Sequence, residues 1–143
     1  MRLYTLGFSH KRAEEFFTIL RDNNISRVVD IRRSNTNQLA GFTKMHDLEY
    51  FLRTILDMPY LHELTLASSH ELMHAYRHNE IPFDKFAAAL RAEYDERHAA
   101  DLDRDTFSDV VLLCSEADPS TCHRIVAANY LAEHWDNVEV IHL

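Results

Sequence analysis

Hydrophobic positions along the chain follow two patterns, short apolar runs and recurrences every three or four residues. Apolar runs typical of β-strands cover residues 2–6, 25–31, 110–114 and 138–141, and residues 60–66 alternate more weakly. Helices are predicted between these runs, over residues 12–23, 47–56, 70–78, 82–94 and 122–134. The chain therefore reads as five strands that alternate with helices.

Local signals place several helix ends and the centre of the sheet. Asp47 and the pair Ser68-Ser69 are expected to cap helices, and Pro82 to open one. The continuous apolar run from Val110 to Cys114 is typical of a central strand covered on both faces. Strands alternating with helices imply right-handed crossovers. We predict a single three-layer α/β domain over residues 1–143, with a mostly parallel sheet of about five strands.

Composition narrows the function classes. The net charge of −8 disfavours broad nucleic-acid binding, which needs Lys and Arg against phosphates. No run of about 18 apolar residues occurs, and the start carries no export signal, so we expect a cytoplasmic protein without a membrane partner. Cys114 and Cys122 are then expected to stay reduced. Nothing in the sequence indicates an oligomeric state.

Three polar loops follow predicted strands, at residues 7–11, 30–37 and 114–124. In open parallel sheets, ligands bind beyond the carboxyl ends of the strands. The third loop leads into a helix whose first amide groups attract anions, and Arg32 and Arg33 add a local positive charge. We expect a small anionic or nucleotide-like ligand at this edge.

Two cysteines are the candidate nucleophiles. Cys122 is the favoured one, because a helix N-terminus and the adjacent His123 and Arg124 stabilise a thiolate. Cys114 ends the apolar strand, where a small buried side chain is the common alternative. Both positions keep a functional and a packing interpretation.

Acidic and basic neighbours supply the remaining candidates. Glu116 is a candidate general base or an orienting partner of His123 or Arg124, but it equally suits bonding to loop amides. Asp30 has the same two interpretations beside Arg32. Arg32 and Arg124 are candidate anion-binding groups.

Several segments resemble the DUF488 family. They are Tyr4-Thr5-Leu6-Gly7-Phe8-Ser9-His10, Val29-Asp30-Ile31-Arg32, and Leu112-Leu113-Cys114-Ser115-Glu116 followed by Cys122-His123-Arg124. The last segment is the most specific, and the resemblance spans nearly the whole chain. It implies a compact α/β fold with a shared polar site and no established reaction. The site residues that it carries over are Gly7, Ser9, Asp30, Arg32, Cys114, Glu116, Cys122, His123 and Arg124.

The sequence departs from the family pattern at two places. Phe8 stands where the family often has His or another polar residue, and residues 64–67 replace a glycine-containing stretch. The Asp-x-Arg motif and the cysteine-bearing loop also look like rhodanese-type sulfurtransferases. However, no glycine- and arginine-rich cradle follows Cys114, and Ser120 stands where a cysteine phosphatase needs its arginine.

A separate motif, His70-Glu71-Leu72-Met73-His74, matches the H-E-x-x-H pattern of zinc peptidases. His78 continues the same helix face. The 10 histidines of the chain make a chance match easier, and a solvated helix face is the alternative. Apart from this motif we expect no metal and no cofactor.

Three hypotheses follow. The first is an enzyme that uses Cys122 or Cys114 for sulfur or acyl transfer, with Glu116, His123 or Asp30 moving protons. The second is a non-catalytic ligand-binding or interaction domain in which these groups hold the loops. The third is the zinc hydrolase.

Overall fold

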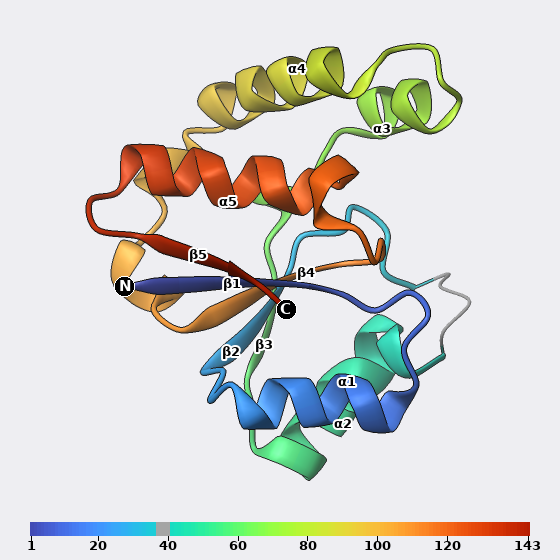
Figure 1. The fold of residues 1–143 in the computed structure, drawn as a ribbon, viewed down its shortest axis with the longest axis vertical. Helices are drawn as coiled ribbons and strands as arrows, with labels where there is room; N and C mark the ends of the chain where they lie inside the picture. Colours follow the sequence, from blue (N-terminus) through green and yellow to red (C-terminus); the bar gives the residue numbers. More distant parts are fainter. Residues whose placement is uncertain (37–40) are drawn as a thin grey trace.

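The computed structural model describes residues 1–36 and 41–143 (Figure 1). It contains one parallel sheet in the order β3-β2-β4-β1-β5. The strands are β1 (Arg2–Gly7), β2 (Arg27–Asp30), β3 (Tyr60–His62), β4 (Val110–Cys114) and β5 (Glu139–His142). The predicted α/β class and parallel sheet are confirmed, and β4 lies at its centre, as its apolar run predicted.

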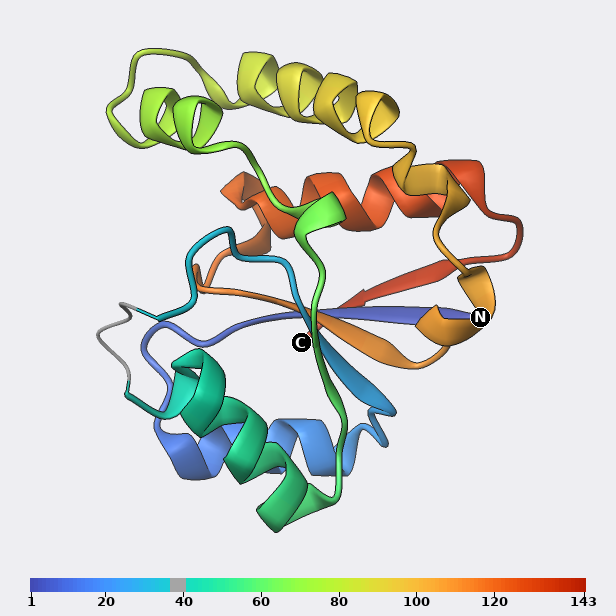
Figure 2. The ribbon, with the colours of Figure 1, turned by 180° about the vertical axis from the view of Figure 1, so that it is seen from behind.

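Helices cover both faces of the sheet (Figures 1 and 2). They are α1 (Ala13–Asp22), α2 (Met45–Leu56), α3 (His70–Arg77), α4 (Phe83–Glu96) and α5 (His123–His134). One core forms between the sheet and α1 with α2, and the other between the sheet and α4 with α5. In both views α5 lies next to the sheet, with α4 beyond it.

The alternation of side chains along β4 assigns its residues to the two cores. Leu112 belongs to the core on the α5 side and Leu113 to the core on the α1 side. Because successive side chains of a strand point to opposite faces, Cys114 faces α5. In β2, Val28 lies in the α1-side core, so Asp30 faces that side as well.

Two predicted boundaries are wrong. Helix α2 begins at Met45 with Lys44 as its N-cap, so Asp47 lies in the first turn, where its charge complements the helix dipole. Strand β3 ends at His62, and residues 64–66 form a 3-10 turn. The Tyr94 hydroxyl of α4 donates to the Leu66 carbonyl at 2.8 Å, which satisfies a group that a longer strand would have paired.

The predicted start of α3 is confirmed, because the Ser69 hydroxyl accepts from the Leu72 amide at 3.2 Å. Pro82 likewise stands at the N-cap of α4. Asn37, in the predicted loop 30–37, lies outside the described residues. Within the described part of the chain, no helix has the length and apolar character needed to cross a membrane.

Candidate functional site

The loops that follow β1, β2 and β4 lie at one edge of the sheet, as predicted, because these strands are parallel neighbours. Backbone hydrogen bonds continue past the strand ends. The Phe8 amide donates to the Cys114 carbonyl at 3.2 Å, and the Ile31 amide donates to the Leu113 carbonyl at 3.2 Å. The three loops are thus held against one another.

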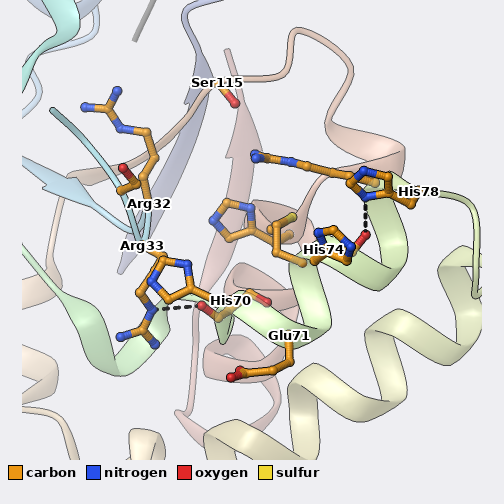
Figure 3. Close-up of a pocket in the computed structure, with 12 residues that line it drawn as sticks. Arg32, Arg33, His70, Glu71, His74, His78 and Ser115 are labelled. Atoms are coloured by element: carbon orange, nitrogen blue, oxygen red, sulfur yellow. Dashed lines mark hydrogen bonds between the residues drawn. The ribbon is translucent and has the colours of Figure 1, made fainter. Parts of the chain in front are cut away.

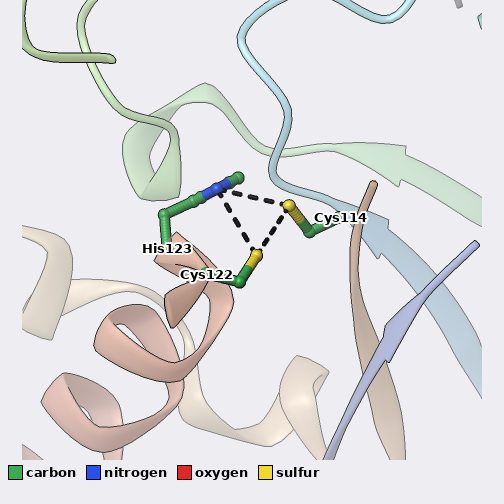
Figure 4. Close-up of side chains that lie close together, drawn as sticks. All are labelled: Cys114, Cys122 and His123. Carbon is green, nitrogen blue, oxygen red and sulfur yellow. Dashed lines mark hydrogen bonds between the residues drawn. The ribbon is translucent and has the colours of Figure 1, made fainter. Parts of the chain in front are cut away.

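A cluster of two thiols and an imidazole lies at this edge (Figure 4). Strand β4 supplies Cys114, and the start of α5 supplies Cys122, its N-cap, and His123. The Cys114 Sγ is 3.3 Å from His123 Nδ1 and 3.0 Å from Cys122 Sγ. All three side chains are buried.

The ring of His123 is oriented by the backbone. Its Nε2 lies 3.1 Å from the Ile31 carbonyl, which accepts hydrogen bonds only. Nε2 therefore carries a proton, and Nδ1 is the nitrogen that exchanges a proton with Cys114.

The electrostatics of the pair favour a thiolate at Cys114. Burial opposes ionisation, but the Cys122 hydrogen bond and the charge on His123 outweigh it and hold the pKa of Cys114 well below its ordinary value. Burial also disfavours the imidazolium, yet the negative Cys114 raises the pKa of His123. The two shifts together favour a thiolate beside an imidazolium.

Cys122 has the opposite tendency. Its thiol donates to Cys114, and this hydrogen bond together with burial raises the pKa of Cys122. The sequence favoured Cys122 because of its helix N-terminus, whereas the geometry favours a thiolate at Cys114. The deciding contact is the one with His123, which lies closer to Cys114 than to Cys122, at 3.3 Å against 3.9 Å.

Arg124 supports the loop after β4. It is fully buried, and its guanidinium donates to the Glu116 carbonyl and, at 2.9 Å, to the Ala117 carbonyl. These contacts differ from the expected role in binding an anion. The carboxyl of Glu116 is half-buried, and burial followed by the negative Cys114 raises its pKa.

Gly7 allows the β1 loop to approach this region closely. A Cβ at position 7 would overlap the Glu116 carbonyl and would lie 2.7 Å from an Arg124 nitrogen. Two residues on, the Ser9 amide donates to the Ser115 carbonyl at 2.8 Å. Through these backbone approaches Gly7 and Ser9 shape the loops.

Asp30 and Arg32 form a buried bidentate ion pair with separations of 2.8 and 2.7 Å. The Tyr60 hydroxyl donates to Asp30 at 2.5 Å, and Arg32 also donates to the Thr43 carbonyl at 2.7 Å. The Arg32 guanidinium carbon lies 5.1 Å from the centre of the Phe8 ring, so the residue that departs from the family pattern packs on this arginine. Asp30 faces α1 and α2, away from the thiols, whereas Arg32 also lines a pocket that His123 lines.

A pocket of about 850 Å³ opens between α3 and the loops after β2 and β4 (Figure 3). Its lining is mainly cationic or potentially cationic, with Arg33, Arg77, His70 and His74 among its side chains. Arg33 is positioned by a 2.9 Å hydrogen bond from its Nε to the Ser68 carbonyl. Two residues next to the thiol cluster also line this pocket: Ser115, which follows Cys114 in the chain, and His123, whose imidazole contacts Cys114.

The H-E-x-x-H motif does lie on a helix, but its groups do not gather as metal ligands. Instead, the ring centres of His74 and His78 lie 3.9 Å apart with the rings tilted by 30°, and His78 Nδ1 lies 2.9 Å from the His74 carbonyl. Within residues 1–36 and 41–143, the one set of three His, Cys, Asp or Glu side chains close enough to share an ion is Cys114, Cys122 and His123.

Sequence reasoning missed Arg77 and Tyr60. Arg77 follows His70 and His74 at spacings of seven and three residues, which places all three on one helix face. Tyr60 pairs with Val28, so it shares the face of Asp30 two residues further along β2. The spacing of Arg77 is visible in the sequence, but its place in a binding pocket follows only from the structure. The contact between Tyr60 and Asp30 likewise depends on the pairing of β2 with β3.

The fold and the site define a parallel α/β protein with a buried cysteine–histidine pair beside a cationic pocket. A family model described as "Domain of unknown function DUF488" matches residues 12–131, and the chain belongs to this family. Comparisons with curated proteins and with solved structures found no match.

Proposed function

We propose that the protein is a cysteine-dependent group-transfer enzyme acting on a small anionic or nucleotide-like substrate, with Cys114 as nucleophile. The observation that carries this proposal is the 3.3 Å contact between Cys114 Sγ and His123 Nδ1 next to the cationic pocket. The Ile31 carbonyl orients the imidazole. The proposed nucleophile, Cys114, thus contacts the proposed base, His123, which in turn contacts the group that orients it.

The proposed step is a nucleophilic displacement. The Cys114 thiolate forms a bond to an acyl carbon or a sulfane sulfur of the substrate, and the leaving group departs with the electron pair of the broken bond. The His123 imidazolium gives its proton to that leaving group. A second acceptor then loses a proton to His123 and takes the transferred group, and the Cys114 thiolate departs: water or a thiol removes an acyl group, and a thiol removes a sulfane sulfur and itself becomes a persulfide.

The pocket supports an anionic substrate. Arg32, Arg33 and Arg77 concentrate positive charge there against a single acidic residue, Glu71, although the chain as a whole carries −8. A volume of about 850 Å³ suits a small molecule of nucleotide size. Because both cysteines must remain thiols, the proposal includes a reducing compartment such as the cytoplasm.

The first experiment is limited alkylation of the native, reduced protein by iodoacetamide, with the modified peptide identified by mass spectrometry. We expect Cys114 to react before Cys122, and His123→Gln to slow the reaction at least about tenfold. Preferential labelling of Cys122, or an unchanged rate in His123→Gln, would contradict the assignment of the nucleophile.

The pocket is tested in the same assay with inorganic pyrophosphate as the probe. Pyrophosphate is expected to protect Cys114, and Arg77→Gln to weaken this protection. Arg53→Gln, a charge change on the exposed surface of α2, is the matched control and should leave protection unchanged. Equal effects of the two substitutions would mean that general charge, rather than the pocket, attracts the anion.

One observation favours a second function, a non-catalytic ligand-binding domain. Cys114 and Cys122 are only 2% and 1% exposed, as packed core cysteines would be. In that case pyrophosphate binds with Arg77-dependent affinity, while neither thiol reacts in the folded protein.

A further inference from the structure

The thiol cluster also has the composition of a metal centre. Cys114 Sγ, Cys122 Sγ and His123 Nδ1 point toward one another from the end of β4 and the start of α5 (Figure 4). Their separations are 3.0, 3.3 and 3.9 Å. Two thiolates and an imidazole are ligands that zinc and other thiophilic cations prefer, and zinc sites with two Cys and one His leave a fourth position for water or substrate.

The separations are close to those that a bound ion requires. Zinc lies about 2.3 Å from sulfur and about 2.0–2.1 Å from nitrogen, so two sulfurs of a tetrahedral site stand about 3.8 Å apart. The sulfurs of Cys114 and Cys122 must therefore separate by less than about 1 Å from the observed 3.0 Å. The distances from His123 Nδ1, 3.3 and 3.9 Å, already bracket the about 3.5 Å expected between sulfur and nitrogen ligands.

The surroundings also suit a ligated histidine. Metal-bound histidines usually donate their other ring N–H to a carboxylate or a backbone carbonyl, which fixes the ring. The Ile31 carbonyl, 3.1 Å from Nε2, already holds His123 with Nδ1 directed at the sulfurs. The backbone amide of Glu116 also stabilises negative charge on Cys114.

We propose that Cys114, Cys122 and His123 bind one thiophilic divalent cation of the Zn²⁺ type, and that the bound ion blocks Cys114 as a nucleophile. The metal and an electrophile need the same sulfur lone pair, so the two states exclude each other. The blocking half of this inference rests on the proposed function, whereas metal binding stands without it.

The test uses the full-length protein, stripped with a chelator and kept reduced, and titrated with Co²⁺ as a spectroscopic substitute for Zn²⁺. We expect one equivalent to bind, with a sulfur-to-cobalt charge-transfer absorption and the visible bands of tetrahedral cobalt. Addition of one equivalent of Zn²⁺ should abolish these bands. Weak binding without a charge-transfer absorption would overturn the proposal, and this readout needs no variant to fold.

Variants then identify the ligands. Cys114→Ser and Cys122→Ser should each abolish the charge-transfer absorption or reduce it at least about tenfold at equal Co²⁺, because a neutral hydroxyl is a poor ligand for these ions. His74→Ala is the matched control and should bind Co²⁺ as the wild type does. Loss of binding in His74→Ala alone would assign the metal to the H-E-x-x-H helix and overturn the proposal.

Alkylation separates this inference from the proposed function. If metal-free protein reacts at Cys114 and one equivalent of Zn²⁺ prevents the reaction, both stand. A protein that binds Co²⁺ through sulfur but never reacts with iodoacetamide retains the metal site and loses the proposed enzyme. Reaction at Cys114 without any metal binding would overturn the metal site and leave the proposed enzyme standing.

Discussion

Asp30 and Cys114 end neighbouring parallel strands, yet their side chains lie on opposite faces of the sheet. Asp30 pairs in register with Leu113, one residue before Cys114, and side chains alternate along a strand. The same end of the sheet therefore carries two polar groups. One is the Asp30–Arg32 ion pair, in which Asp30 faces α1 and α2, and the other is the thiol cluster, which faces α5. The segments that resemble the family contain both groups.

Asp30→Asn tests this separation. The substitution leaves the buried Arg32 without its carboxylate partner and should lower the free energy of unfolding by about 3–5 kcal/mol, measured by urea denaturation. The rate of Cys114 alkylation in the folded protein should be unchanged. A slower alkylation with unaltered stability would instead place Asp30 in the thiol chemistry.

Tyr60→Phe removes the hydroxyl that donates to Asp30 at 2.5 Å. Because this hydrogen bond involves a charged acceptor in a partly buried position, we expect a loss of about 1.5–3 kcal/mol in unfolding free energy. Tyr50→Phe, at a side chain that is 53% exposed, is the control and should have no measurable effect. Equal effects would show that the Tyr60 hydroxyl contributes nothing specific.

The same residue predicts a pH dependence. Burial and the negative Asp30 raise the pKa of Tyr60 above its ordinary 10.0, so the folded protein keeps this proton when the unfolded chain loses it. The contribution of Tyr60 is fully present below pH 10 and declines as the pH rises further. The stability difference between wild type and Tyr60→Phe should therefore shrink between about pH 8 and about pH 11. A constant difference would contradict the raised pKa.

Gly7→Ala should be destabilising because its Cβ meets backbone, which has little freedom to move away. We expect a loss of at least about 1–3 kcal/mol, together with faster proteolysis of the loop after β4. Gly41→Ala is a matched control, because a Cβ there has no heavy atom within 4 Å. The thermal midpoint of Gly41→Ala should equal that of wild type.

Arg124→Ala removes the donors to the Glu116 and Ala117 carbonyls and should cost about 3–5 kcal/mol, the range for a broken buried charge interaction. Arg124→Lys keeps the charge but loses the bidentate geometry of the guanidinium, so its stability should lie between that of the wild type and that of Arg124→Ala. Pyrophosphate affinity of the folded Arg124→Lys protein should match wild type. A variant of unchanged stability that no longer binds pyrophosphate would restore Arg124 to the anion site.

Much of the fold could be predicted because local patterns and tertiary packing agree. The central position of β4 follows from its five apolar residues, and the start of α3 follows from Ser69. The end of β3 could not be predicted, because it depends on Tyr94, a residue of α4 far along the chain, which binds the Leu66 carbonyl. Non-local hydrogen bonds of this kind leave no periodic signal.

The candidate site shows the same limit in its chemistry. The motif correctly gathers Cys114, Cys122 and His123 into one cluster, but the more probable nucleophile from sequence was Cys122. The proposal assigns this role to Cys114 because of its contact with His123, and the Ile31 carbonyl that orients His123 is a backbone group that sequence motifs do not represent. Likewise, Arg124 binds loop carbonyls whose position follows from how the chain turns after β4.

Helix α3 forms a wall of the pocket but buries none of its own residues, whereas the thiol cluster below is buried on every side. Substitutions on its pocket face, at His70, His74 and Arg77, change the charge offered to a ligand with little cost to folding. The charge that the pocket offers to a ligand can therefore be altered by substitutions on α3 alone, with the contact between Cys114 and His123 left in place.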